Sequence, residues 1–220
     1  MTHTIEIIPS LLVSTEQEFI QKYRGLDGSV NCIQLDIADG IFVPNTTWRD
    51  PAVIQKEVTD TDVELHLMVN NPLEELEEWR GVPQIKRILV HYECYNFESI
   101  FEKLPSYGWQ VGIAINPDTP ISVLEPYIPH IQAVLIMSVI PGKQGQPFIP
   151  AVLEKTSALR NQHPNLFIEI DGAVNTTTLP AIIASGVNAI CPGSAIVGSG
   201  NPKENVKNMQ QLIHTLTNPT

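Results

Sequence analysis

Three titratable side chains stand inside apolar stretches of the sequence. Asp36 lies in CIQLDIADG (residues 32–40), His66 in VELHLM (63–68) and Asp171 in FIEID (167–171). Burying an unpaired carboxylate costs several kcal/mol, so residues of this kind are expected to have partners or a task. One imidazole and two carboxylates form a ligand set suited to zinc, manganese or iron.

The two carboxylates also indicate proton transfer. If Asp36 and Asp171 flanked a substrate, one could remove a proton from a carbon and the other could return a proton to the opposite face, giving an epimer. A carbon next to a carbonyl is too weak an acid for this unless the ene-diolate is stabilised, and a metal ion is one common stabiliser. Glu64 and Glu169 are expected to orient the metal ligands from behind.

Eight short apolar runs rich in Val, Ile and Leu must position these residues. They are IEIIPS (5–10), CIQLDIAD (32–39), VELHLM (63–68), RILVHY (87–92), VGIAIN (111–116), AVLIMSV (133–139), FIEID (167–171) and AICPGS (189–194). Helical spacing or helix-start residues occupy 14–23, 72–79, 119–127, 149–160, 175–186 and 201–216 between them. Strands alternating with helices predict a parallel sheet, and eight such units in 220 residues predict a single (β/α)8 TIM barrel domain spanning residues 1–220.

Such a barrel would gather polar residues at one rim, because its active sites lie at the C-terminal ends of the strands. Side chains two residues apart share a strand face, which groups Gln34 with Asp36 and His66 with Met68. Each residue alone also has an ordinary alternative, since a strand-end Asp often caps a turn and an inward His often belongs to the core. Asp39 precedes a glycine and is expected to shape a turn.

Three short glycine motifs follow the last three predicted strands. They are PGKQG (141–145), DGA (171–173) and PGSA (192–195). Barrels frequently bind phosphate through backbone N–H groups in the loops after strands 7 and 8. Local amides of this kind would let an acidic protein hold a phosphate.

Charge and composition exclude several other classes. The chain has 13 basic and 24 acidic residues and a formal net charge of −11, which disfavours a nonspecific grip on nucleic acid or an anionic membrane. The N-terminal residues do not resemble a signal peptide, and no apolar stretch approaches the roughly 20 residues of a membrane span. A cytoplasmic protein is expected. Its three cysteines are widely spaced in apolar runs and are expected to be buried thiols.

These motifs together resemble the ribulose-phosphate 3-epimerase family. The likeness runs through IIPSLL, LDIADGIFVPN, ELHLMVNNP, INPDTP, VLIMSVIPGKQGQPFIP, IEIDGAVN and PGSAIVG, in the family's order and spacing. The resemblance implies a phosphate-binding (β/α)8 barrel that interconverts D-ribulose 5-phosphate and D-xylulose 5-phosphate with a divalent metal, which would be Zn, Mn, Fe or Co. It also implies a homo-oligomer.

The resemblance assigns roles by position. Asp36 and Asp171 correspond to the catalytic acid/base pair and to two metal ligands, and His66 corresponds to a third ligand within the substrate site. Gln34 stands where the family has a second histidine, and its status as a ligand stays open because an amide oxygen is a weaker donor than imidazole. The other substrate-binding residues implied are Ser10, Met68, Met137, Gly142, Gly145, Gly172, Gly193 and Ser194. Ser10 would contact the sugar, the methionines would roof the intermediate or simply fill core, and the remainder would cradle the phosphate.

The chain departs from the family pattern at positions close to the site. Besides Gln34, the chain has Ala38 in place of a third methionine, Ile140 in place of Asn, Lys143 in place of an aromatic residue, and Gln144 and Ala173 in place of glycines. These departures leave open a paralogue that binds a phosphorylated metabolite without turning it over, with a weakened metal site. A decarboxylase or lyase on the same barrel is a third alternative. It is disfavoured because strand 2 lacks the lysine between aspartates of the related orotidine monophosphate decarboxylase group.

Overall fold

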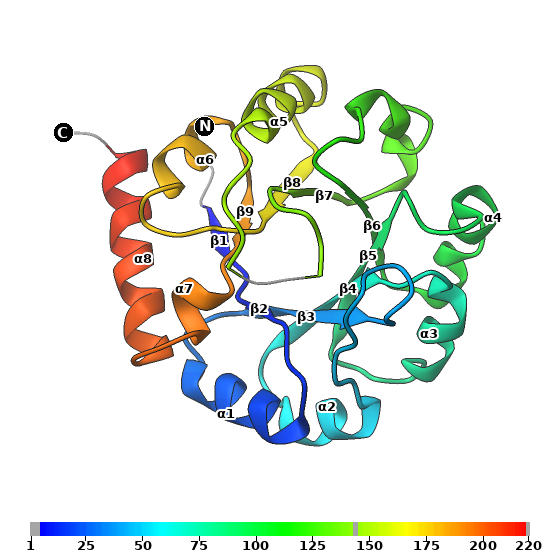
Figure 1. Ribbon diagram of the computed structural model, residues 1–220, viewed down its shortest axis with the longest axis horizontal. Helices are drawn as coiled ribbons and strands as arrows, with labels where there is room; N and C mark the ends of the chain where they lie inside the picture. Colours follow the sequence, from blue (N-terminus) through cyan, green and yellow to red (C-terminus); the bar gives the residue numbers. More distant parts are fainter. Residues whose placement is uncertain (1–4, 143–144, 219–220) are drawn as a thin grey trace.

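The computed structural model describes residues 5–142 and 145–218, and within them the chain forms one sheet of nine parallel strands surrounded by helices (Figure 1). The strands are β1 (Glu6–Ile7), β2 (Ser10–Leu11), β3 (Cys32–Ala38), β4 (Asp62–Met68), β5 (Ile85–His91), β6 (Gln110–Ile115), β7 (Ala133–Met137), β8 (Phe167–Asp171) and β9 (Ala189–Cys191). Their spatial order is β1-β9-β8-β7-β6-β5-β4-β3-β2. Neighbours in this order are also neighbours along the chain, apart from the pairing of β1 with β9.

The two ends of this order close the sheet into a ring, because β1 and β2 are two pieces of one segment. β1 pairs with β9, and β2 pairs with β3. Between the two pieces, the Ile8 amide donates to the Ile190 carbonyl, and the Pro9 carbonyl accepts from the Gln34 amide. Since Pro9 has no N–H of its own, the ladder is interrupted there without opening the sheet. The predicted (β/α)8 barrel is confirmed, with its first strand split in two.

Helices form the outer layer around the ring (Figure 1). They are α1 (Glu16–Leu26), α2 (Pro51–Glu57), α3 (Pro72–Glu78), α4 (Phe97–Phe101), α5 (Ala151–Gln162), α6 (Leu179–Ala184), α7 (Ser194–Val197) and α8 (Pro202–Thr217), with 3-10 helices η1 (Leu104–Tyr107), η2 (Ile121–Leu124) and η3 (Ile128–His130). Outward strand residues such as Leu35 and Ile37 are fully buried with helix residues such as Phe19 in one large apolar cluster. In the described ranges no helix has the length and apolar character needed to cross a bilayer.

The helical predictions differ from the structure in two ways. The segment 119–127 was expected to form one helix, but it contains η2 and leads into η3 instead. Pro126 explains the break, because proline lacks the N–H that an α-helix needs and its ring clashes with the carbonyl four residues earlier. The sequence analysis also did not predict α2, α4 or α7. Of these, α2 begins after Asp50, whose carboxylate accepts from the amides of Ala52 and Val53. This is an ordinary N-cap.

The interior of the barrel holds a buried ion cluster below the rim. Arg87 donates to Glu64 at 2.9 Å and to Glu169 at 2.6 Å, and both glutamate side chains are fully buried. Burial first, and the Glu169 carboxylate next, raise the pKa of Glu64 well above its ordinary value. The two glutamates therefore pair with Arg87, and the prediction that they orient metal ligands is wrong. The three cysteines are buried and free, as predicted.

Candidate active site

Asp36 of β3, His66 of β4 and Asp171 of β8 meet inside the C-terminal end of the barrel. Their ligand atoms all lie within 4.8 Å of one another. His66 Nδ1 is 2.8 Å from Asp36 Oδ1 and 3.7 Å from Asp171 Oδ2. Adjacent parallel strands put Asp36 level with His66, whereas Asp171 reaches them from a strand across the ring. The sequence analysis predicted this convergence from strand parity together with the predicted barrel.

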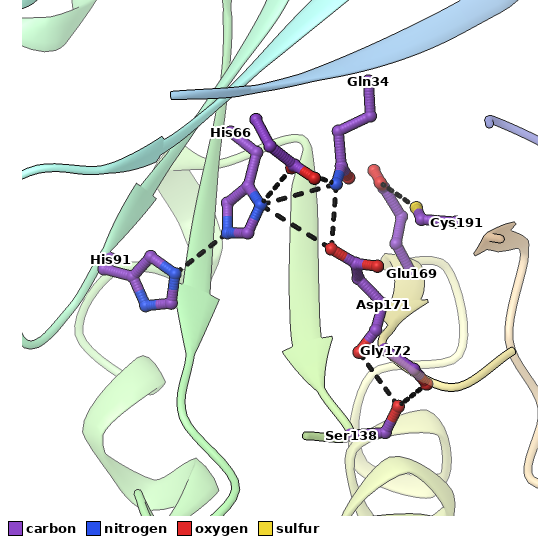
Figure 2. Close-up of polar contacts among 9 residues, drawn as sticks. Gln34, His66, His91, Ser138, Glu169, Asp171, Gly172 and Cys191 are labelled. Carbon is purple, nitrogen blue, oxygen red and sulfur yellow. Dashed lines mark hydrogen bonds and ion pairs between the residues drawn. The ribbon is translucent and has the colours of Figure 1, made fainter. Parts of the chain in front are cut away.

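Gln34 lies at the centre of the same cluster (Figure 2). Its Nε2 donates to Asp36 Oδ1 at 2.8 Å and to Asp171 Oδ2 at 2.9 Å, and it lies 3.4 Å from His66 Nδ1. Its Oε1 is buried and has no hydrogen-bond partner. One amide nitrogen thus bridges two carboxylates that would otherwise repel each other.

The orphaned Oε1 of Gln34 allows a test of whether these residues fit a divalent metal. Half a turn about the terminal bond exchanges the amide oxygen and nitrogen. The oxygen would then face both carboxylates and the imidazole, an arrangement that is favourable only around a cation. Two carboxylates, one imidazole and one amide oxygen match the mixed donor sets that hold transition metals. The residues therefore fit a metal, with Gln34 as a weak fourth ligand.

Burial and mutual charge shift the protonation of the cluster. Burial, together with the Asp36 carboxylate, raises the pKa of Asp171 to about 7, although His66 and the Gln34 amide act in the opposite direction. Burial would lower the pKa of His66, but the hydrogen bond and charge of Asp36 and the charge of Asp171 raise it overall. Asp171 can therefore both lose and regain a proton near neutral pH.

A cavity of about 360 Å³ opens above this cluster. Ten predicted site residues line it, namely Ser10, Asp36, Met68, Met137, Gly142, Gly145, Asp171, Gly172, Gly193 and Ser194. His66 and Gln34 are fully buried and do not appear among its lining residues. None of the described residues that line the cavity has a cationic side chain. Among these described residues, the donors available to a bound anion are backbone N–H groups, hydroxyls and the side-chain amides of Gln146 and Asn175.

Two glycines of the cavity wall are required by the backbone. Gly142 has φ +96°, and a Cβ there would lie 2.7 Å from Val43 Cβ; Gly172 has φ +107°, and its Cβ would lie 2.6 Å from Val139 Cγ2. Ala173 follows with φ +49°, a left-handed conformation that is unfavourable for alanine. Glycine would adopt this conformation without strain. The two substitutions at Lys143 and Gln144 lie outside the described residues.

Ser138, at the end of β7, holds the backbone that carries Asp171. Its amide donates to the Asp171 carbonyl at 2.7 Å, and its Oγ donates to the carbonyls of Asp171 and Gly172 (Figure 2). The sequence analysis placed no function on Ser138, and a polar residue directly after an apolar strand was the only signal. Asp39 shapes a turn as predicted, because its carboxylate accepts from the amides of Ile41, Phe42 and Asn70.

Solved structures of other proteins share this fold. The chain aligns over 97% of its length with KGPDC from Streptococcus mutans, covering 99% of that chain with a TM-score of 0.74 and 10% identity. A 3-hexulose-6-phosphate synthase aligns with a TM-score of 0.68 and 13% identity, over 95% of this chain and 99% of the other. At such identities the likeness shows the fold. The protein is a (β/α)8 barrel with a cavity at its C-terminal rim.

Sequence relatives then identify the family. The model of the ribulose-phosphate 3-epimerase family matches residues 6–197. The ribulose-phosphate 3-epimerase of Bacillus subtilis is 30% identical, over 94% of this chain and 98% of its own length, and that of Mycobacterium bovis is 33% identical, over 89% and 87%. The chain belongs to the ribulose-phosphate 3-epimerase family. The expected enzyme class, an isomerase acting on carbohydrates, is confirmed by these relatives.

Proposed function

We propose that this protein inverts C3 of a ketose phosphate, and that its substrate pair is D-ribulose 5-phosphate and D-xylulose 5-phosphate. The observation that carries the proposal is the meeting of Asp36 and Asp171 at one cavity, from strands on different sides of the barrel. Inversion needs one group that takes a proton and another that returns one. The names of the relatives at 30–33% identity supply the substrate.

Asp171 is suited to exchange a proton with the substrate carbon. In the metal-free protein its pKa of about 7 leaves both protonation states populated near neutral pH. A bound cation would shift this carboxyl toward the ionised form, which is the form that accepts a proton. Asp36 supplies the second carboxyl group. Without a metal, the Gln34 amide donates to both carboxylates and holds them close together. Ser138 fixes the backbone of Asp171 and so the position of its carboxyl group in the cavity.

Asp36, His66 and Asp171 would hold a divalent metal, with Gln34 Oε1 as a fourth donor. A bound cation would stabilise negative charge on the substrate oxygens while the neighbouring carbon is deprotonated. The homo-oligomer, the cytoplasmic location and the single domain over residues 1–220 remain predictions.

The phosphate of the substrate would lie against the glycine-rich wall. Gly172, Gly193 and Ser194 line the cavity, and their backbone N–H groups are the donors that such a loop offers an anion. Ser10 lies on the same cavity and offers a hydroxyl to the sugar. Met68 and Met137 add apolar surface over the reacting carbons.

Deuterium exchange at C3 tests the proposal directly. The purified protein, supplied in turn with Zn, Mn, Fe or Co, is incubated with D-ribulose 5-phosphate in deuterated water, and NMR follows both exchange and the appearance of the epimer. Asp171→Asn should abolish exchange. Asp62→Asn is the matched control, because Asp62 is a half-exposed carboxylate paired with Lys86 at the opposite end of β4, and it should leave exchange unchanged. The epimerase proposal is abandoned if the wild type exchanges no deuterium with any of these metals.

Gln34 favours a second candidate function, namely a protein that binds the sugar phosphate without turning it over. The amide bridges both carboxylates and is a weaker metal donor than imidazole. This candidate predicts saturable binding of D-ribulose 5-phosphate, measured by calorimetry, with no deuterium exchange. The two functions therefore separate in the same pair of experiments.

A further inference from the structure

A chain of hydrogen bonds runs from His66 away from the cavity. His66 Nε2 lies 2.9 Å from Nε2 of His91, the last residue of β5, as Figure 2 shows. His91 Nδ1 lies 3.2 Å from Glu93 Oε2. Both histidines are fully buried, so water does not compete for these nitrogens. These contacts connect the imidazole of His66, a candidate metal ligand, to the carboxylate of Glu93, which does not line the cavity.

The carboxylate at the far end sets the direction of every hydrogen bond in this chain. An ionised Glu93 can only accept, so His91 must carry its proton on Nδ1. Of the two Nε2 atoms that face each other, one must donate and the other must accept, and a neutral His91 ring with its proton on Nδ1 presents a lone pair on Nε2. His66 must therefore donate from Nε2. When His66 is itself neutral, its Nδ1 is left with a lone pair, and that atom faces Asp36 and Asp171.

Glu93 is well fixed for this role. Its Oε1 accepts from the Asn116 amide at 2.8 Å and from the Thr119 hydroxyl. Burial would raise the pKa of Glu93, but these bonds and the one from His91 hold it below its ordinary value. Lys155 Nζ donates to the carbonyls of Asn116 and Pro117 and so holds the same loop in place. The Glu93 carboxylate, at the end of this series of hydrogen bonds, is thus kept ionised and held in one position.

We propose that Glu93 and His91 are positioning residues that act through His66, holding its ring and its tautomer so that Nδ1 offers a lone pair to a divalent metal. The inference deepens the proposed function and rests on its metal site. Partners of this kind, one contact beyond a metal ligand, typically change metal affinity by about 10–100-fold. The alternative is that His91 and Glu93 only provide hydrogen-bond partners for each other and for other buried polar atoms. In that case their substitution would lower the unfolding free energy and leave the metal affinity unchanged.

Metal affinity in Glu93→Gln separates the two roles. Dissociation constants for Co²⁺ and Zn²⁺ are measured on the metal-stripped full-length protein by competition with a chromophoric chelator, which needs no substrate. Glutamine keeps the shape of Glu93 but can also donate, so it no longer imposes one tautomer on His91. We expect affinity to fall about 10-fold or more. Glu75→Gln is the matched control. Glu75, on α3, is a buried carboxylate that pairs with Arg49 and accepts from the Trp79 indole, and its substitution should leave both constants unchanged.

The ring nitrogens of the wild type provide a second measurement that needs no substitution. Two-bond ¹H–¹⁵N correlation spectra of the Zn²⁺-loaded protein should show His91 protonated on Nδ1 and His66 protonated on Nε2. A proton on Nε2 of His91 would overturn the inference. The inference would also be overturned if folded Glu93→Gln bound both metals with dissociation constants within about twofold of the wild type. That result would leave the proposed function intact. Failure of the wild type to bind either metal would overturn the inference together with the metal site on which it rests.

Discussion

The raised pKa of Asp171 predicts how the stability of the metal-free protein depends on pH. The folded protein holds the Asp171 carboxyl at a pKa of about 7, whereas the ordinary value for aspartate is 3.8. Between these two values the folded state binds a proton that the unfolded state has lost. Stability should therefore fall as pH rises from about 4 to 7 and then level off with respect to this group.

The size of the effect follows from the shift itself. A displacement of about 3 pKa units at about 1.36 kcal/mol each gives at most about 4 kcal/mol over the whole window, and about 2–3 kcal/mol between pH 5 and 7. His66 acts in the same direction at higher pH, because its raised pKa gives stability that is present below 6.5 and lost above it. His91, with its lowered pKa, and Glu64, with its raised pKa, also contribute to the pH dependence between pH 4.5 and 6.5. The difference between the wild type and Asp171→Asn over this range therefore isolates Asp171, because both proteins share these other groups.

Urea unfolding followed by tryptophan fluorescence measures this dependence after treatment with a chelator. The difference in unfolding free energy between Asp171→Asn and the wild type should grow in favour of the variant as pH rises, because the amide cannot ionise. Asp62→Asn should track the wild type throughout. Saturating Zn²⁺ should flatten the wild-type slope, since a bound cation favours the ionised carboxylate. Parallel curves for the wild type and Asp171→Asn would refute the reasoning that burial and Asp36 raise this pKa.

Three further substitutions test other parts of the site. Gln34→His should tighten Zn²⁺ binding about tenfold or more, because imidazole is the better donor; a chelator competition that finds no gain would contradict the account of this position. Ala173→Gly should raise the unfolding free energy by about 0.5–1 kcal/mol, because glycine adopts φ +49° without strain, and an unchanged urea midpoint would speak against strain there. Ser138→Ala should lower it by about 1–2 kcal/mol and also lower kcat, because Asp171 and Gly172 lose a hydrogen-bond donor. A loss of stability with kcat unchanged would limit Ser138 to a role in folding.

The sequence predicted that Asp36, His66 and Asp171 lie together because two simple rules are enough for it. Strand parity assigns each side chain to the inner face, and the barrel brings all strand ends to one rim. Arg87 escaped prediction because parity does not say which residue reaches across the barrel to Glu64 and Glu169. The contact between His66 and His91 depends on the register of β4 and β5, which shifts between Val63 and Glu64, and no local pattern reveals such a shift.

The split first strand has a consequence for how this protein forms. Among the strands that the structure describes, β1 pairs only with β9, which lies almost the whole length of the chain away. Contacts of such long sequence separation are slow to form, and the ring cannot seal until nearly all of the protein has left the ribosome. Until then, β1 and β8 would present open edges that invite pairing with other chains. The seam at residues 6–11 is therefore where folding finishes, and a chain that ends before residue 189 would keep an aggregation-prone edge.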